Sequence, residues 1–293
     1  TSEKLKAGVV LIALALLGHE LFFGGADPEA ERESKEPVRP RIPEAAAQAD
    51  PVLAAKKYGQ AMRSYVEDTI SGYRLAANLL TQSVSLDQNN AKGYAMLASS
   101  FINLVEVSER NENYFITVTK LIELARAKAL NLPETVIADT EYFLLMNRAD
   151  SAQARIVDYT RAYQNFDPVM FHYLAEVFLT RVDPESAARY SAQFPDARAY
   201  SPQLFYLRGR IAEDLQDFVA SEVQYGKAIA LNKKHARSHL RLAERKCGSC
   251  RVQECEKHVR FLVKNGELSA PRALARAYYL EAKTHQHYQR WED

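Results

Sequence analysis

The three cysteines of the chain lie together in one short segment that could do chemistry. Cys247 and Cys250 are the first and last residues of a CGSC segment, and Cys255 and His258 follow it. The four residues form a C-x2-C-x4-C-x2-H arrangement. Thiolates and imidazoles are the ligand types that tetrahedral zinc prefers, and two nearby thiols can also form a disulfide. The surrounding pattern predicts that Cys247 ends one helix, Cys250 lies in a turn, and Cys255 and His258 share a face of the next helix.

Four interpretations of this segment are open. One pair of thiols could be oxidised and staple the turn, with the third thiol left over, if the domain lies outside the cytoplasm. Cys255, at a position where small residues pack, could instead be an ordinary core residue. Four zinc ligands within 12 residues of a hairpin would also have to respect helix geometry. A thioredoxin-like redox role would need a strand and helix context that is absent here.

No other catalytic pattern is present. The sequence has no Gly-rich phosphate loop, no G-x-S-x-G and no H-E-x-x-H, and its acidic residues are spread as helix-surface charges. His172, His239, His285 and His287 are too scattered for a metal cluster, so each is interpreted as a surface or satisfied helix residue. The sequence therefore predicts a non-enzymatic protein without a cofactor, with zinc at the cysteines as the alternative.

Composition favours an all-α fold. Only 11 glycines and 11 prolines occur in 293 residues, and a hydrophobic content of 47% is ample for a core. Lys plus Arg number 38 against 37 Asp plus Glu, a formal net charge of +1. This balance lacks the positive footprint of a nucleic-acid binder, so nucleic acid is not expected as a partner. Since no catalytic pattern is present, no small-molecule substrate is expected either.

An apolar run near the start predicts contact with a membrane. Residues 7–25 are just long enough for a hydrocarbon core of ~30 Å and are interpreted as a transmembrane helix or uncleaved signal anchor, with a cleaved signal as the rival. Lys4 and Lys6 precede the run and acidic residues follow it. The positive-inside rule therefore places residues 1–6 in the cytoplasm and everything after residue 26 outside it, so that the folded part lies on the periplasmic side of the inner membrane. Residues 26–50, rich in proline and charge, predict an extended linker.

From residue 51 to the end one helical pattern recurs. The spacing Leu-Ala-x-x-Phe occurs at residues 97–101 and again at 174–178, each time on one helical face. Pro168 and Pro202 begin units 34 residues apart, and the series returns 34 residues later. This resembles the tetratricopeptide repeat (TPR) family, and other helix-pair solenoids are the structural alternative. The resemblance implies a right-handed superhelical solenoid of about six hairpins over residues 51–293, closed by a capping helix.

The resemblance also implies a concave groove lined by the first helix of each hairpin. Aromatic and guanidinium groups suit recognition of peptide backbone and carboxylates, and a solvated helix face is the alternative interpretation. Projecting the repeat gives these groove residues: Tyr206, Arg210, Glu213, Arg237, Arg241, Lys92 and Asn103.

The expected function is that of a membrane-anchored scaffold that binds other proteins and assembles or stabilises a cell-envelope complex, such as secretion, pilus or motility machinery. A chaperone or quality-control adaptor for translocating clients is the alternative. A zinc or redox role in a sensor or enzyme is a second alternative, and it depends only on the cysteine segment.

Overall fold

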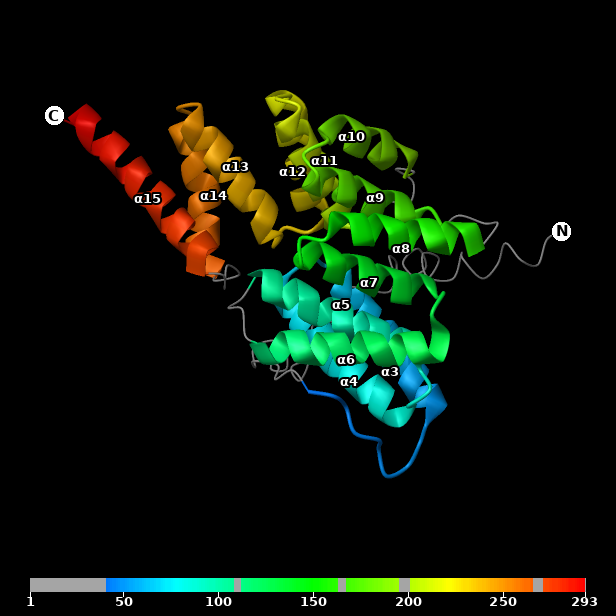
Figure 1. The fold of residues 1–293 in the computed structure, drawn as a ribbon. Helices are drawn as coiled ribbons and strands as arrows, with labels where there is room; N and C mark the ends of the chain where they lie inside the picture. Colours follow the sequence, from blue (N-terminus) through cyan, green and yellow to red (C-terminus); the bar gives the residue numbers. More distant parts are fainter. Residues whose placement is uncertain (1–40, 108–111, 163–166, 195–200, 266–270, 293) are drawn as a thin grey trace.

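The protein is a succession of α-helices in a computed structural model that describes residues 41–107, 112–162, 167–194, 201–265 and 271–292 (Figure 1). No strand occurs within these ranges, which agrees with the all-α prediction. In this described part of the chain, neighbouring helices pair into six hairpins, and one further helix packs on the last hairpin. The helices are α3 (Pro51–Tyr65), α4 (Ile70–Leu86), α5 (Ala91–Val107), α6 (Glu112–Ala129), α7 (Pro133–Leu145), α8 (Ala149–Ala162), α9 (Val169–Thr180), α10 (Pro184–Gln193), α11 (Pro202–Asp214), α12 (Phe218–Leu231), α13 (Ala236–Gly248), α14 (Val252–Asn265) and α15 (Pro271–Glu292).

The 34-residue repeat is visible in the backbone of the turns inside the hairpins. Val182, Gln216 and Cys250 follow one another at this step, and each has a φ near +60°: 61°, 61° and 59°. Asn147, with φ 56°, is the corresponding residue one hairpin earlier, and Asp68, with φ 51°, lies in the turn between α3 and α4. A left-handed residue ends the first helix of each of these hairpins and reverses the chain. The described chain is therefore a TPR-like array of helical hairpins.

Local signals in the sequence explain where the helices start. Asp183 and Asp217, again 34 residues apart, cap α10 and α12 by accepting from Ser186 N and Ala220 N. Proline stands at the start of α3, α7, α10 and α11, where its missing N–H would have no helical partner. The turns and helix starts thus follow from residue types at fixed offsets.

The apolar core is divided along the array. The largest cluster joins α3 to α7, with Tyr73, Leu80, Tyr94 and Phe101 almost fully buried. Helices α13, α14 and α15 share a cluster of their own around Val259. No cluster of buried apolar residues within the described ranges joins α12 to α13. The last three helices therefore have an apolar cluster of their own.

Gly209 allows α11 and α12 to approach closely. A β-carbon at this position would lie 2.4 Å from Cε1 of Tyr225, a ring that is fully buried. We expect Gly209→Ala to lower the free energy of unfolding by about 2 kcal/mol, because the ring has no free space to enter. Urea denaturation measures this. Gly226→Ala on α12 is the control: apart from the adjacent backbone of its own helix, no atom would lie within 4 Å of a β-carbon at this position, so the change should be neutral or raise stability by up to about 1 kcal/mol. Equal effects of the two changes would contradict the packing argument.

The membrane segment predicted at residues 7–25 lies outside the described residues, as does most of the predicted linker. Within the described ranges, no helix combines the length and apolar character needed to cross a bilayer. The described end of the linker already packs on the array: Ile42 contacts the largest core cluster, and Ala46 N donates to Ser85 O at 2.8 Å. The folded body therefore includes residues before 51.

Candidate partner-binding face

Side chains of α11 and α13 meet on one side of the array. Tyr206, Arg210 and Glu213 follow an i, i+4, i+7 spacing and share one face of α11. Arg237 and Arg241 lie four residues apart on α13. We call these five residues the α11–α13 face. Five of the seven predicted groove residues therefore belong to two neighbouring helices.

Tyr206 is the centre of this face. The guanidinium of Arg237 lies 5.8 Å from the centroid of its ring, within the range of a cation–π contact. Arg241 is hydrogen-bonded to Tyr206. Burial lowers the pKa of Arg241, but Tyr206 and Glu213 outweigh burial and raise it above the usual range. Arg241 therefore keeps its charge in this half-buried position.

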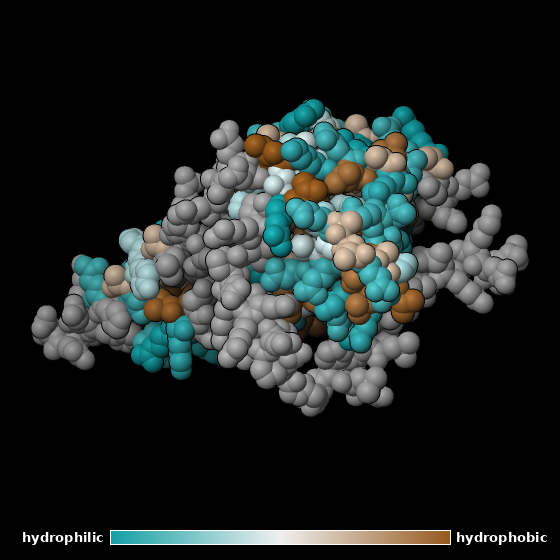
Figure 2. All heavy atoms as spheres, turned by 90° about the horizontal axis from the view of Figure 1, so that it is seen from below, coloured by the Kyte–Doolittle hydropathy of each residue, from teal (hydrophilic) through white to brown (hydrophobic). Residues whose placement is uncertain are grey.

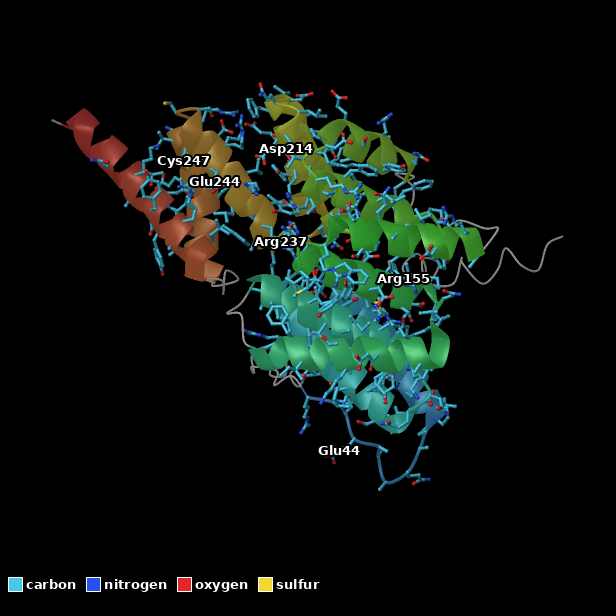
Figure 3. The ribbon with its side chains drawn as sticks, in the orientation of Figure 1. Glu44, Arg155, Asp214, Arg237, Glu244 and Cys247 are labelled. Atoms are coloured by element: carbon cyan, nitrogen blue, oxygen red, sulfur yellow. A yellow bond between two sulfur atoms is a disulfide. The ribbon has the colours of Figure 1, made fainter. Side chains whose placement is uncertain are left out.

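The carboxylates near this face are engaged by groups of the same chain. Tyr225 donates to Glu213 at 2.8 Å. Glu244, labelled on α13 in Figure 3, accepts from Arg276 of α15 at 3.0 Å and ion-pairs with Arg241 at 3.5 Å. These contacts join α11 to α12, and α13 to α15, through polar groups.

Arg210 differs from its neighbours. Its side chain is half-buried, and it makes no hydrogen bond or ion pair with any residue that the structure describes. A guanidinium carries five N–H donors and keeps its charge at all physiological pH values. Arg241, whose side chain is 40% exposed, lies on the facing helix. Arg210 and Arg241 together present N–H donors that could bind a carboxylate.

Lys92 and Asn103 lie elsewhere, on α5. Lys92 ion-pairs with Glu134 at 3.5 Å. Asn103 is buried and donates to the hydroxyl of Tyr65 at 3.2 Å and to Ser99 O at 3.0 Å. Because both donors of Asn103 are used inside the protein, we leave it out of the proposed binding face. The projected repeat did not anticipate that Tyr65 of α3 reaches α5.

The cysteine segment forms the turn between α13 and α14. Cys247 lies at the end of α13 and is bonded to Cys255 of α14, with the two α-carbons 5.2 Å apart, while Cys250 is exposed with a free thiol. The α-carbon separation is within the usual range for a disulfide. With this pairing, no group of three His, Cys, Asp or Glu side chains in the described ranges is arranged to hold a metal ion.

His258 is hydrogen-bonded to another histidine instead. Its Nδ1 lies 2.9 Å from Nδ1 of His239, whose Nε2 lies 3.1 Å from Lys233 O. Since a carbonyl only accepts, His239 carries its proton on Nε2, and His258 donates to its Nδ1. The ring of His239 also stacks on Phe261 with centroids 3.9 Å apart. Both imidazoles are therefore satisfied in their neutral forms.

Two further residues of this region were not predicted from the sequence. Asp68, in the turn between α3 and α4, accepts from Arg237 at 2.9 Å and lies 2.7 Å from His235. His235 is also 5.7 Å, between ring centroids, from Tyr206. Asp68 and His235 are 167 residues apart, so no local signal could have joined them. The only hint in the sequence is an aspartate in a turn.

Comparison with known proteins gives no family for this chain. No protein-family model matches the chain, and no curated protein does either. Among solved structures, the crystal structure of yeast Tom70 superposes with a TM-score of 0.47 and 12% sequence identity, over 96% of this chain and 79% of that chain. At this level of similarity the class of the protein depends on its own helices. These define a TPR-like helical repeat protein.

Proposed function

We propose that this protein is a non-enzymatic scaffold whose α11–α13 face binds a carboxylate-bearing segment of a partner protein. The observation that carries the proposal is Arg210, a half-buried guanidinium without a partner in the described ranges, on the helix that faces Arg241. An incoming carboxylate would meet a partly exposed guanidinium that no residue of the described ranges pairs with, and this pairing would complete the site.

The chemistry of this face suits a short acidic segment. Each arginine could donate two parallel N–H···O bonds to a carboxylate, and hydrogen bonds to charged groups contribute about 1.5–3 kcal/mol each. Tyr206, half-buried between the two helices, offers a rigid ring for the adjoining backbone. Figure 2, which shows the molecule from below, has hydrophobic residues only in separate patches on a largely hydrophilic described surface.

The setting we propose is the periplasmic side of the inner membrane, with residues 7–25 as a single-pass anchor in contact with the bilayer. The charge pattern around residues 7–25 supports this orientation. The Cys247–Cys255 disulfide supports an oxidising compartment, because disulfides are rare in the cytosol. An anchor would raise the effective concentration of the scaffold for partners in the same membrane, as in an envelope secretion, pilus or motility complex.

Crosslinking and affinity purification from native membranes test the proposal. The variant is Arg210→Glu with Arg241→Glu in the full chain. Arg237 stays unchanged because it also donates to Asp68 in the turn between α3 and α4, and a change there would disturb a contact outside the proposed binding face. The control is Arg161→Glu, a change of charge at a side chain that is 78% exposed on α8. We expect one defined set of envelope proteins with the wild type and the control, and loss of that set with the double variant.

Other outcomes would point elsewhere. An unchanged set of partners in the double variant would place binding outside the α11–α13 face. Weak capture of many unfolded chains instead of one set would favour a chaperone or quality-control adaptor. If no protein is enriched by the wild type, the scaffold proposal fails.

A further inference from the structure

Asp68 connects the start of the array to its last three helices. Its side chain is 1% exposed. One carboxylate oxygen, Oδ2, lies 2.7 Å from Nε2 of His235, and the other, Oδ1, accepts from Arg237 at 2.9 Å and from the hydroxyl of Tyr73. Burial alone would raise the pKa of Asp68, but Arg237, His235 and Tyr73 outweigh it and hold the pKa below the usual range. The buried carboxylate is therefore charged and fully hydrogen-bonded.

His235 connects this carboxylate to helix α13. Its Nδ1 accepts from Ser238 N at 3.3 Å and caps the first turn of α13. A backbone N–H can only donate, so Nδ1 is unprotonated in the neutral ring and Nε2–H donates to Asp68. The carboxylate thus lies at the N-terminus of α13, where the helix dipole favours negative charge. Figure 3 shows Arg237 at this end of α13, next to the rest of the array.

Several other contacts between α13–α15 and the rest of the array are polar, beside ring contacts such as that of Arg245 of α13 with the ring of Phe218 of α12, 3.6 Å away. Asn232, just before α13, donates to Glu67 O at 2.6 Å. Glu222 of α12 accepts from Lys246 of α13 at 2.7 Å and from Arg251 at 3.1 Å. No buried apolar cluster of the described ranges spans α12 and α13. A body with its own core, joined through hydrogen bonds and ion pairs, can move as a unit when these bonds break.

We propose that Asp68 is a latch: its bonds to His235 and Arg237 hold helices α13–α15 in a closed position, and breaking them lets these helices pivot about residues 232–235. Pivoting separates Arg237 from Tyr206, so the shape of the α11–α13 face depends on the latch. The closed and open states differ in the contact between Asp68 and His235, which are 167 positions apart in the sequence. The latch can therefore be tested without any partner, independently of the proposed binding function.

Pulsed electron resonance between two spin labels tests the latch. One label goes on Cys250, the exposed free thiol between α13 and α14, and the other on Lys56→Cys, an exposed position of α3. Asp68→Asn removes the charge but keeps the shape, and asparagine tolerates the left-handed backbone at φ 51°. His235→Asn keeps a capping side chain for α13 but is too short to reach Asp68. We expect one narrow distance distribution in the wild type and longer, broader ones in both variants.

Asp139→Asn is the matched control, because Asp139 is an equally buried aspartate paired with arginines on α6 and α8, away from α13. It should keep the wild-type distance distribution although it destabilises the array. Amide hydrogen exchange in α13 should become about ten- to hundredfold faster in Asp68→Asn and His235→Asn, the effect of losing a hydrogen bond to a charged group. Far-UV circular dichroism confirms that each variant is folded. Wild-type distances and exchange rates in folded Asp68→Asn and His235→Asn would overturn the latch, as would equal opening in Asp139→Asn.

Discussion

Replacing Asp139 with alanine is expected to lower the free energy of unfolding by about 3–5 kcal/mol. Asp139 lies on α7 with no exposed surface, and it ion-pairs with Arg126 of α6 at 2.8 Å and with Arg155 of α8 at 2.6 Å. Arg155 is itself 12% exposed and also donates to Leu130 O. Without the carboxylate, Arg155 is left as a nearly buried charge with no counter-ion, and three helices lose their common contact.

Urea denaturation followed by circular dichroism measures this change. Asp158→Ala is the control: Asp158 is 70% exposed on α8 and lies 4.0 Å from Arg161. Exposed pairs of this kind contribute at most about 1 kcal/mol, so the control should remain close to the wild type. Adding Arg155→Met to Asp139→Ala should recover part of the loss, since the uncompensated charge is then gone. If Asp139→Ala and Asp158→Ala have the same stability, the buried ion pairs do not hold α6, α7 and α8 together.

The helices and their repeat could be predicted because their signals are local. Each turn inside a hairpin and each helix start depends on a few residues at fixed offsets, such as Asp183 before α10 and Asp217 before α12, 34 positions apart. The positions of Cys247, Cys250 and Cys255 at a helix end, in a turn and on the next helix follow from the same register. A 34-residue period therefore determines the local path of most of the chain.

Contacts between distant hairpins could not be predicted from that period. Tyr65 of α3 donates to Glu141 of α7 at 3.0 Å, and Asp68 reaches His235 at the start of α13. Both contacts depend on the angle by which each hairpin is rotated against the next. Small differences in packing change this angle, and the changes add up along the array. For this reason Asn103 was predicted on an open face and is buried, while the role of Asp68 was missed. Nor did the sequence indicate which pair of cysteines is bonded.

Buried histidines add a second large effect, a loss of stability in mild acid. Burial lowers the pKa of His172 to about 4, with Asp68 opposing and Arg208 adding to the shift. Burial also lowers the pKa of His239 and of His258 to about 4. A proton added at Nδ1 of His239 would direct two N–H groups at each other across 2.9 Å. Each of these three histidines therefore favours the neutral ring in the folded state.

The direction of the pH effect follows from the lowered pKa values. An unfolded histidine takes up a proton near pH 6.5 and these folded ones only near pH 4, so between these values acid favours the unfolded chain. Stability is complete above about pH 6.5 and falls as the pH drops towards 4. His172 alone should cost about 2 kcal/mol between pH 7 and pH 5. The pair of His239 and His258 adds to this, with a smaller share for each ring because solvent reaches it in part. The Asp68 carboxyl, whose pKa is lowered, affects stability only below about pH 4.

Urea midpoints at pH 7, 6, 5 and 4.5 check this expectation, and His172→Phe isolates one histidine. Phenylalanine keeps the edge-on contact of ring 172 with Tyr173, whose centroid lies 5.2 Å away, but cannot take up a proton. Between pH 7 and pH 5 the free energy of unfolding should fall by about 2 kcal/mol less in the variant than in the wild type. Above pH 7 the free energy of unfolding should change with pH in the same way in both proteins. Parallel curves over the whole range would mean that His172 takes up its proton equally in both states, which is incompatible with a neutral buried ring. Because His172 lies next to Tyr173, which donates to Glu141 as Tyr65 does, its protonation would disturb the polar contacts that join α3, α7 and α9.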